Sequence, residues 1–515
     1  MIFHNLFLKK INQFDSWRFK SLILIAIGII FKWISYFINY SVYANNRPHL
    51  YNNFLGDDRV YMEYCENFFN YGTYFIKLGE IVDYTFRMPA FNLIYYPLRL
   101  FLSKDLTMDG IVILQVTIAG ICSYFLAKIS FFLFSSKKIF YLTFFISLFG
   151  FLNTFYISIL FREGFAYSSI IFGVYFYLKG LSSKKKIDFL ISGFFITWLI
   201  FLRPYSGVLF VLMSSILLYF FYFKKRITLG SFIFFNSFFV IFISLWTIRN
   251  YKLTDRFIPL ETSSGWMNES EALNAKVRFI KSFGFHWEDW VEGSQGGWLT
   301  YTNVKLDKNT INSIFPKRTF NGDLNPDSLV KLKYHYNLFL RSGYVENREF
   351  HGEKATRLFD KFIIELKKNR ILDYYFLNRL RVLKSFLNNN TSKDLKNIKY
   401  PFNVILFFFE TYFNLIIKIL GFISLILLVK KFYKNLLILS LIVFFPVFIV
   451  SFFCLYGGSD ESRFYFLCVP FLIISSSYLV MRFWSKSTFF KIILCILFLI
   501  PLFPSYSKVV ELIKF

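Results

Sequence analysis

The chain has 515 residues, of which 56% are hydrophobic and 23% aromatic, and its formal net charge is +27. This apolar content, with a mean hydropathy of +0.47, exceeds what a soluble domain of this size needs, so the composition indicates a polytopic membrane protein. Much of the positive surplus falls in short clusters between apolar runs, where it sets membrane orientation. We therefore do not read the charge as a nucleic-acid-binding signal.

The cysteines give no framework for a disulfide-rich or zinc-binding protein. Four of the five lie inside apolar runs, and none has a CxxC or Cys/His spacing. They are Cys65, Cys122, Cys454, Cys468 and Cys495.

Long apolar runs predict an all-α membrane protein. A helix needs about 20 mostly apolar residues to cross the bilayer core, and about eleven stretches approach this length. The basic N-terminus precedes a run that is too long for a signal-peptide core, so we expect an uncleaved first span. The predicted spans are residues 22–43, 110–134, 139–160, 165–178, 187–202, 205–223, 229–248, 401–429, 436–455, 464–481 and 489–503.

One further apolar stretch, residues 88–102, is short for a span and contains Arg99. We interpret it as an amphipathic helix lying in the membrane interface. With this choice the basic clusters between the later spans fall on the same side as the basic N-terminus, as the positive-inside rule requires. The N-terminus is then cytoplasmic, and residues 44–109 and 249–400 are external. This arrangement suits a bacterial inner membrane.

The topology divides the chain into three parts. Residues 1–248 form an N-terminal transmembrane module that includes the first external loop at 44–109. Residues 249–400 form a large external segment, and residues 401–515 form the C-terminal transmembrane helices. The first half of the external segment is rich in Gly, Trp, Asn and Ser and predicts irregular loop. The second half, from about residue 328 to 387, has apolar residues at helical spacing and predicts helices.

Acidic residues and arginines recur at the external ends of the predicted spans. Ionisable residues at the membrane boundary are costly unless they are paired or used, so the set is a candidate site. Carboxylates accept a proton from an attacking hydroxyl, and arginines neutralise a phosphate. The set comprises Asp57 and Asp58 in the first loop, Arg162 with Glu163, Arg203 with Pro204, Arg249 with Asn250, and Asp460 to Arg463.

The order of these elements resembles the GT-C superfamily of membrane glycosyltransferases, in particular the branch of protein O-mannosyltransferases and lipid A aminoarabinose transferases. The resemblance covers most of the membrane region, although Met88 between Arg87 and Pro89 departs from the usual form and the large loop is only loosely similar. The matching elements are Asp57-Asp58 with Tyr61, Arg87 with Pro89, Arg162-Glu163, Arg203-Pro204, Arg249-Asn250 with Pro259 and Gly265 beyond, and ESRFYFLCVP from Glu461 to Pro470.

This resemblance implies an inverting transferase that takes a sugar from a polyprenyl-phosphate carrier. The acceptor would be an envelope glycan, a lipid or a protein at the outer face. Asp57 would be the general base, with Asp58 as second choice, and Glu163 would orient the acceptor or assist the base. Some relatives use a divalent metal ion, and the sequence leaves this open. The residues implied for substrate or phosphate binding, without ranking, are Tyr61, Arg87, Arg162, Arg203, Arg249, Glu461 and Arg463.

Each residue also has a purely structural interpretation. Glu461 and Arg463 are equally consistent with an ion pair at a helix end. Tyr61 is consistent with an interfacial anchor, and Arg203-Pro204 with a helix start. The histidines of the external segment, His286, His335 and His351, have no metal-like spacing and are interpreted as ordinary surface or packing residues.

Two other functions stay open. A polymerase that joins lipid-linked oligosaccharide repeats would depend on arginines of the large loop rather than on Asp57. A flippase or transporter would carry charges inside its spans and show inverted repeats. The predicted spans are nearly free of charge and no repeat is visible, so the transporter is the weakest alternative.

Overall fold

The computed structural model describes most of the chain, and the bounds below refer to those residues. They are residues 18–43, 49–51, 57–78, 81–149, 162–225, 227–261, 271–282, 298–299, 307–315, 317–341, 345–387, 402–408, 413–454, 462–484 and 488. The predicted span at 489–503 and the glycine- and tryptophan-rich stretches around residues 265 and 295 lie outside them.

The chain forms two compact units. Unit 1 comprises Met1–Glu261, Asn389–Val447 and Phe466–Phe515, and unit 2 comprises Thr262–Asn388 and Phe448–Tyr465. Each unit is described by itself.

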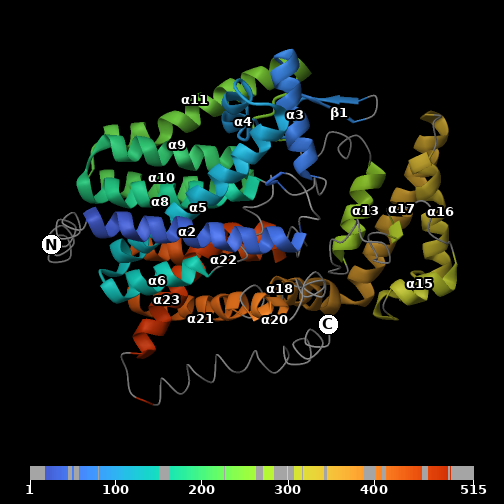
Figure 1. The fold of residues 1–515 in the computed structure, drawn as a ribbon. Coiled ribbons are helices and arrows are strands. Elements are labelled where there is room, and N and C mark those ends of the chain that lie inside the picture. Colours follow the sequence, from blue (N-terminus) through green and yellow to red (C-terminus); the bar gives the residue numbers. More distant parts are fainter. Residues whose placement is uncertain are drawn as a thin grey trace. The chain divides into compact units, whose positions relative to one another are not determined.

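The N-terminal part of unit 1 is mainly helical. The helices pack in a series, α2 on α5, α5 on α8, α8 on α9 and α9 on α11, and Figure 1 shows their ribbons running alongside one another. Their bounds are α2 Arg18–Tyr43, α3 Asp57–Tyr71, α4 Asn92–Arg99, α5 Lys104–Phe134, α6 Lys137–Leu148, α8 Arg162–Ser183, α9 Lys186–Leu202, the short 3-10 turn η1 Pro204–Ser206, α10 Gly207–Tyr222 and α11 Leu229–Thr254.

Two short strands lie between α3 and α4. Strands β1 (Ile76–Leu78) and β2 (Ile81–Asp83) pair antiparallel, with Ile76 opposite Asp83. This hairpin starts the segment that leads to Arg87 and then to α4.

Helices α2 and α5 approach backbone to backbone. A Cβ atom added at Gly28 would collide with the backbone of Gly120, and one added at Gly120 would collide with Ile29. Small residues allow such close helix contacts in membrane proteins, where dispersion and close packing hold helices together.

The C-terminal region is also helical. Helix α21 packs on α23, and α23 packs on α6. The bounds are α20 Phe402–Phe407, α21 Asn414–Phe432, a π-helical stretch Ile438–Phe444, α22 Phe445–Phe452, a 3-10 stretch Ser462–Cys468 and α23 Val469–Trp484.

The part of unit 2 that the structure describes is a helical cluster around an aromatic core. Phe279, Tyr336, Phe359 and Phe362 lie in that core with Trp298, all nearly without exposed surface. The bounds are α13 Glu271–Ser282, α15 Lys308–Ile314, η2 Lys317–Thr319, α16 Pro326–Arg341, α17 Val345–Asn369, η3 Asp373–Leu377 and α18 Asn378–Leu387. The expectation of irregular loop before residue 328 is wrong at α13.

Within the described part of the chain, five helices are long and apolar enough to cross a membrane by length and composition. They are Phe19–Ile38, Lys104–Phe134, Pro204–Tyr222, Leu229–Thr254 and Tyr465–Trp484. An all-α membrane protein is thereby supported, whereas the count of eleven spans stays a prediction. Residues 92–99 are helical as α4, and the placement of this helix in the membrane interface also stays a prediction.

Helices α5 and α11 both extend beyond the predicted spans. Helix α5 begins at Lys104 rather than at residue 110, because Ser103 caps it by accepting a hydrogen bond from the Leu106 amide at 3.4 Å. Helix α11 continues to Thr254, so Arg249 and Asn250 are helical residues.

Candidate functional site

Helix α3 starts at Asp57, so Asp57 and Asp58 occupy its first turn. Their side chains lie outside the described part of the structure. Tyr61 follows one helical turn later and is buried, with 2% of its surface exposed. The contacts of Tyr61 are those of one face of α3.

Two guanidinium groups lie against the Tyr61 ring. The Cζ atom of Arg162 is 4.6 Å from the ring centroid, and that of Arg87 is 5.2 Å from it. Arg87 also stacks on Phe86, with 3.7 Å between Cζ and the ring centroid. Cations over aromatic faces are stabilised by the ring quadrupole. We call Tyr61, Arg87 and Arg162 the Tyr61 cluster; it brings together three of the residues predicted to bind substrate.

Arg162 is held by a carboxylate from the segment that follows α11. Its Nη1 atom donates to Glu261 Oε2 at 2.9 Å. Arg162 has 4% of its side chain exposed and Glu261 18%, so the pair is largely desolvated. Arg162 is thus oriented by an ion pair as well as by Tyr61.

The chain reaches Glu261 by folding back on α11. The left-handed residue Asp255 (φ 53°) ends the helix. The Asn250 side chain then donates to the Ile258 carbonyl at 2.9 Å, and Trp246 Nε1 donates to the Leu260 carbonyl at 3.1 Å. These two bonds hold the segment that presents Glu261.

Glu163 pairs with Arg203, not with its sequence neighbour Arg162. Their side chains are 2% and 7% exposed and form a close ion pair. Arg203 directly follows Leu202, the last residue of α9. The helical region is disfavoured for a residue that precedes a proline, and Arg203 accordingly has an extended backbone (φ −145°, ψ 93°). Glu163 Oε2 has no hydrogen-bond partner among the described residues.

Arg249 lies in a different setting and bonds to backbone oxygens. Its Nη1 donates to the Tyr84 carbonyl at 2.6 Å, its Nη2 donates to the Tyr74 carbonyl, and its Cζ lies 4.7 Å from the Trp246 ring. The guanidinium therefore ties α11 to the region around β1 and β2. Among the described residues, no carboxylate forms an ion pair with it.

The turn that precedes Arg87 is fixed by a buried carboxylate. Asp83 Oδ1 accepts from the backbone amides of Thr85 at 2.7 Å and Phe86 at 2.9 Å. Tyr64 donates its hydroxyl to the Asp83 carbonyl at 3.2 Å. Burial, and next the charge of Asp83, raises the pKa of Tyr64, so this phenol stays a donor.

A second polar contact joins α3 to α4. Arg99 Nε donates to Glu66 Oε1 at 2.8 Å, and the Tyr95 hydroxyl donates to the same oxygen. Burial by itself would raise the pKa of Glu66, but the hydrogen bonds from Tyr95 and Arg99 outweigh it, and the pKa is lowered. The carboxylate is ionised at neutral pH and holds α4 in place.

Unit 1 also contains an apolar cavity of about 460 Å³. Its walls come from α4, α9 and α11, and from Pro89 and Ala90 in the segment before α4. Arg249 is the charged residue among its described lining residues. Concave, mostly apolar sites with a few polar groups are typical of small-molecule binding.

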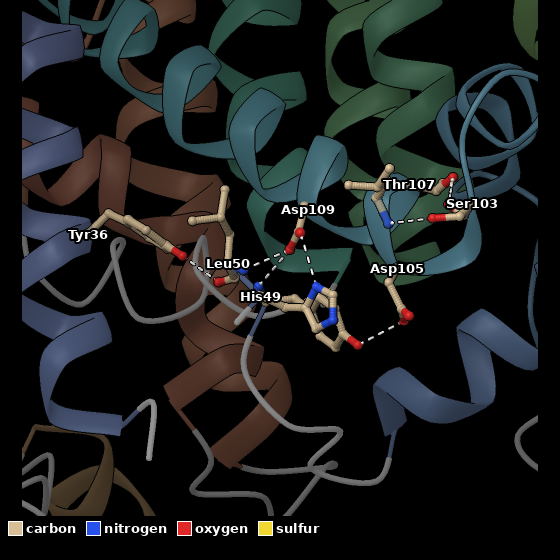
Figure 2. Close-up of polar contacts among 9 residues, drawn as sticks. Tyr36, His49, Leu50, Ser103, Asp105, Thr107 and Asp109 are labelled. Atoms are coloured by element: carbon tan, nitrogen blue, oxygen red, sulfur yellow. Dashed lines mark hydrogen bonds and ion pairs between the residues drawn. The ribbon is translucent and has the colours of Figure 1, made fainter. Parts of the chain in front are cut away.

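Figure 2 shows a further anchor in the first predicted external loop. Asp109, near the start of α5, accepts from the Leu50 amide at 2.7 Å and contacts His49 Nδ1 at 3.3 Å. Tyr36 donates its hydroxyl to the Leu50 carbonyl, and Tyr51 donates to Asp105 Oδ1 at 3.0 Å. The segment at 49–51 is thus attached to both α2 and α5.

The remaining predicted site residues are not placed. Glu461 lies outside the described residues, and Arg463 belongs to the 3-10 stretch Ser462–Cys468 without a described side chain. The described residues contain no group of three or more metal-ligating side chains. His335 and His351 do meet across α16 and α17, with their Nδ1 atoms 3.0 Å apart.

Sequence reasoning missed three carboxylates of this region: Glu261, Asp83 and Asp109. Each is a single acid in a segment without a motif. The one sequence signal is that all three fall in or next to segments predicted to be external. The Leu50 partner of Asp109 lies 59 positions away and the Arg162 partner of Glu261 lies 99 positions away, so no local spacing identifies these two carboxylates.

Comparison of the chain with protein-family models, with curated proteins and with solved structures found no match.

Proposed function

We propose that the protein is a membrane glycosyltransferase that takes a sugar from a polyprenyl-phosphate donor and transfers it to an acceptor at the outer face of the membrane. The observation that carries this proposal is the segment at residues 87–93. It contributes Arg87 to the Tyr61 cluster, and Pro89, Ala90, Asn92 and Leu93 to the wall of the apolar cavity. A substrate with an anionic head and a long apolar tail matches both.

In this proposal Asp57 is the general base. It removes the proton from the acceptor hydroxyl, whose oxygen attacks the anomeric carbon of the sugar from the face opposite the phosphate. The bond between that carbon and the phosphate oxygen breaks, and the polyprenyl phosphate leaves as an anion. The proton ends on Asp57, and the sugar inverts its configuration.

The arginines would act on the departing phosphate to different degrees. Arg203 and Arg162 pair with Glu163 and Glu261. Arg87 is our first choice for the phosphate contact, because its segment, residues 87–93, also lines the apolar cavity. A guanidinium aimed at the charge that develops on the leaving group lowers the barrier without a general acid. Glu163, held by Arg203, would act by positioning and not as the base.

The test is sugar transfer by the purified full chain in lipid, with a panel of polyprenyl-phosphate sugars. We expect Asp57→Asn to abolish transfer, since removal of a general base costs about 10²–10⁴-fold in rate. Asp58→Asn should have the smaller effect. The matched control is Asp327→Asn, an exposed carboxylate of unit 2 that pairs with Lys308 and should keep wild-type activity.

Full activity in both Asp57→Asn and Asp58→Asn, in protein that inserts normally, would remove the general-base assignment. A polymerase dependent on the arginines of the large segment would then be the better candidate. The localisation in a bacterial inner membrane with an external site is part of the same proposal, and protease accessibility of unit 2 from the outer face would check it.

A further inference from the structure

Two polar atoms in the wall of the apolar cavity have no partner. Asn92 and Thr197 both line the cavity, and they are 8% and 3% exposed. Asn92 Oδ1 and Thr197 Oγ1 are buried without a hydrogen-bond partner among the described residues. Buried polar atoms in folded proteins are rarely left unsatisfied, so each such case needs an explanation.

Thr197 differs from two other helical hydroxyls of unit 1, those of Thr247 and Ser169. Thr247 in α11 donates to the Ile243 carbonyl of its own helix at 2.7 Å, and Ser169 in α8 donates to the Phe165 carbonyl at 2.7 Å. This back-bonding to a carbonyl three or four residues earlier is the usual solution for a hydroxyl in an apolar helix. Thr197 does not use it, although its residue faces the cavity.

Asn92 and Thr197 flank one contact between their two segments. Trp198, the residue after Thr197, donates its Nε1 proton to the carbonyl of Ala90 at 3.0 Å. Asn92 follows two positions later at the start of α4. This hydrogen bond holds α9 and the start of α4 together, so Asn92 and Thr197 belong to adjacent segments of the cavity wall.

A purely hydrocarbon occupant would leave both atoms unsatisfied. A hydroxyl group has one donor and two acceptor sites, so it can donate to Asn92 Oδ1 and accept from the Thr197 hydroxyl. Sites with buried polar groups of this kind discriminate strongly against ligands that lack the matching group. The rest of the wall is apolar and aromatic, which fits an alkyl chain.

We propose that the cavity binds a long-chain amphiphile that carries a hydroxyl group on its apolar part, and that Asn92 and Thr197 recognise this hydroxyl. The inference rests on the proposed function only in treating the cavity as a lipid site. It names the chemical class of that lipid, a hydroxylated chain as opposed to plain hydrocarbon.

The experiment compares binding of octadecanoate with binding of positional isomers of hydroxyoctadecanoate to the purified full chain in detergent. Both probes carry the same carboxylate, and they differ by the hydroxyl alone. We expect at least one isomer to bind the wild-type protein on the order of tenfold more tightly than octadecanoate. Thr197→Val and Asn92→Leu keep the approximate shape and remove the polar atoms, and both should lose this preference.

Thr247→Val is the matched control, because the Thr247 hydroxyl donates to a carbonyl of its own helix, α11, and Thr247 does not line the cavity. It should keep the preference of the wild type. Retained octadecanoate binding in Thr197→Val shows that this variant is folded. Equal binding of all isomers and octadecanoate to wild type, or an unchanged preference in the Thr197→Val, Asn92→Leu double variant, would overturn the proposal.

The binding assay also separates this inference from the proposed function. A hydroxyl preference in a protein that transfers no sugar would support the proposed lipid site and contradict the proposed transferase activity. Sugar transfer without any hydroxyl preference would support the transferase activity and contradict the proposed recognition of a hydroxylated chain.

Discussion

The two units of the molecule place their ion pairs in opposite environments. In unit 1 the pairs Glu163–Arg203 and Arg162–Glu261 are almost entirely desolvated. In unit 2, Arg278 pairs with Glu271 and Asp360, but all three side chains are between 43% and 63% exposed. Desolvated charges are costly to leave alone and solvated ones are not. These buried charges of unit 1 therefore constrain the structure far more than the exposed charges of unit 2.

The largest effect should follow from breaking one buried pair. Arg203→Met leaves the Glu163 carboxylate buried without its partner, and we expect a loss of about 3–5 kcal/mol in the free energy of unfolding. The measurement is thermal unfolding of the purified protein in detergent. The double variant Glu163→Leu, Arg203→Met removes both charges and should recover most of the loss. If Arg203→Met unfolds at the wild-type temperature, the pair has no structural weight.

A buried lysine in unit 2 breaks the simple contrast. Lys333 is fully buried and donates to the Leu299 carbonyl at 2.6 Å. Burial, and next the charges of Lys276 and Arg341, lowers its pKa from 10.5 to about 7. The unfolded chain then binds more protons between these two pH values, so stability should rise with pH across this window. The slope is at most about 1.4 kcal/mol per pH unit.

This slope is measured as the temperature at which α16 becomes protease-sensitive, between pH 7 and pH 10.5. Lys333→Met should remove the slope and raise the transition temperature. Lys331→Met, at an exposed position of the same helix, should leave the slope as it is. A wild-type profile without a slope would contradict the lowered pKa.

A partly buried contact in unit 1 should give an intermediate effect. Because hydrogen bonds from Tyr95 and Arg99 lower the pKa of Glu66 from 4.5, its contribution is present above pH 4.5 and is lost as pH falls through the lowered pKa. At neutral pH, Glu66→Gln should cost about 1.5–3 kcal/mol. Thermal unfolding near neutral pH and well below pH 4.5 checks both points. Equal acid sensitivity of Glu66→Gln and wild type would assign the acid transition elsewhere.

The smallest effect should come from the exposed network of unit 2. Arg278→Ala removes two ion pairs at once, yet we expect a loss of no more than about 1 kcal/mol, because exposed pairs are screened by water and salt. The same protease assay measures it. A loss of stability as large as that of Arg203→Met would contradict the conclusion that the buried pairs of unit 1 matter more for stability than the exposed pairs of unit 2.

Hydropathy predicted the helical membrane architecture, because apolar runs have to be buried in lipid or protein whatever their partners are. The helix ends could be predicted less well from hydropathy. The cap at Ser103 and the continuation of α11 past Arg249 depend on local hydrogen bonds and on the chain that returns to Glu261. Hydropathy contains no information on either.

The site shows why charged neighbours in sequence are poor guides to charged partners. Arg162 and Glu163 suggested one functional pair, but consecutive helical residues point about 100° apart and do not face each other. Arg162 consequently meets Glu261, and Glu163 meets Arg203. The cavity was not predictable either, since the aromatic residues of α9 and α11 have the same composition whether they face lipid or an internal space.

The contact between Gly28 and Gly120 has a consequence for how the protein is made. It joins the first two helices that are long and apolar enough to span a membrane. Chains emerge from the ribosome N-terminus first, so these two helices are inserted before α8 to α11 are synthesised. We expect them to dock as an early hairpin. A bulky residue at Gly120 would then act during biosynthesis and lower the yield of inserted protein, even where the finished molecule tolerates it.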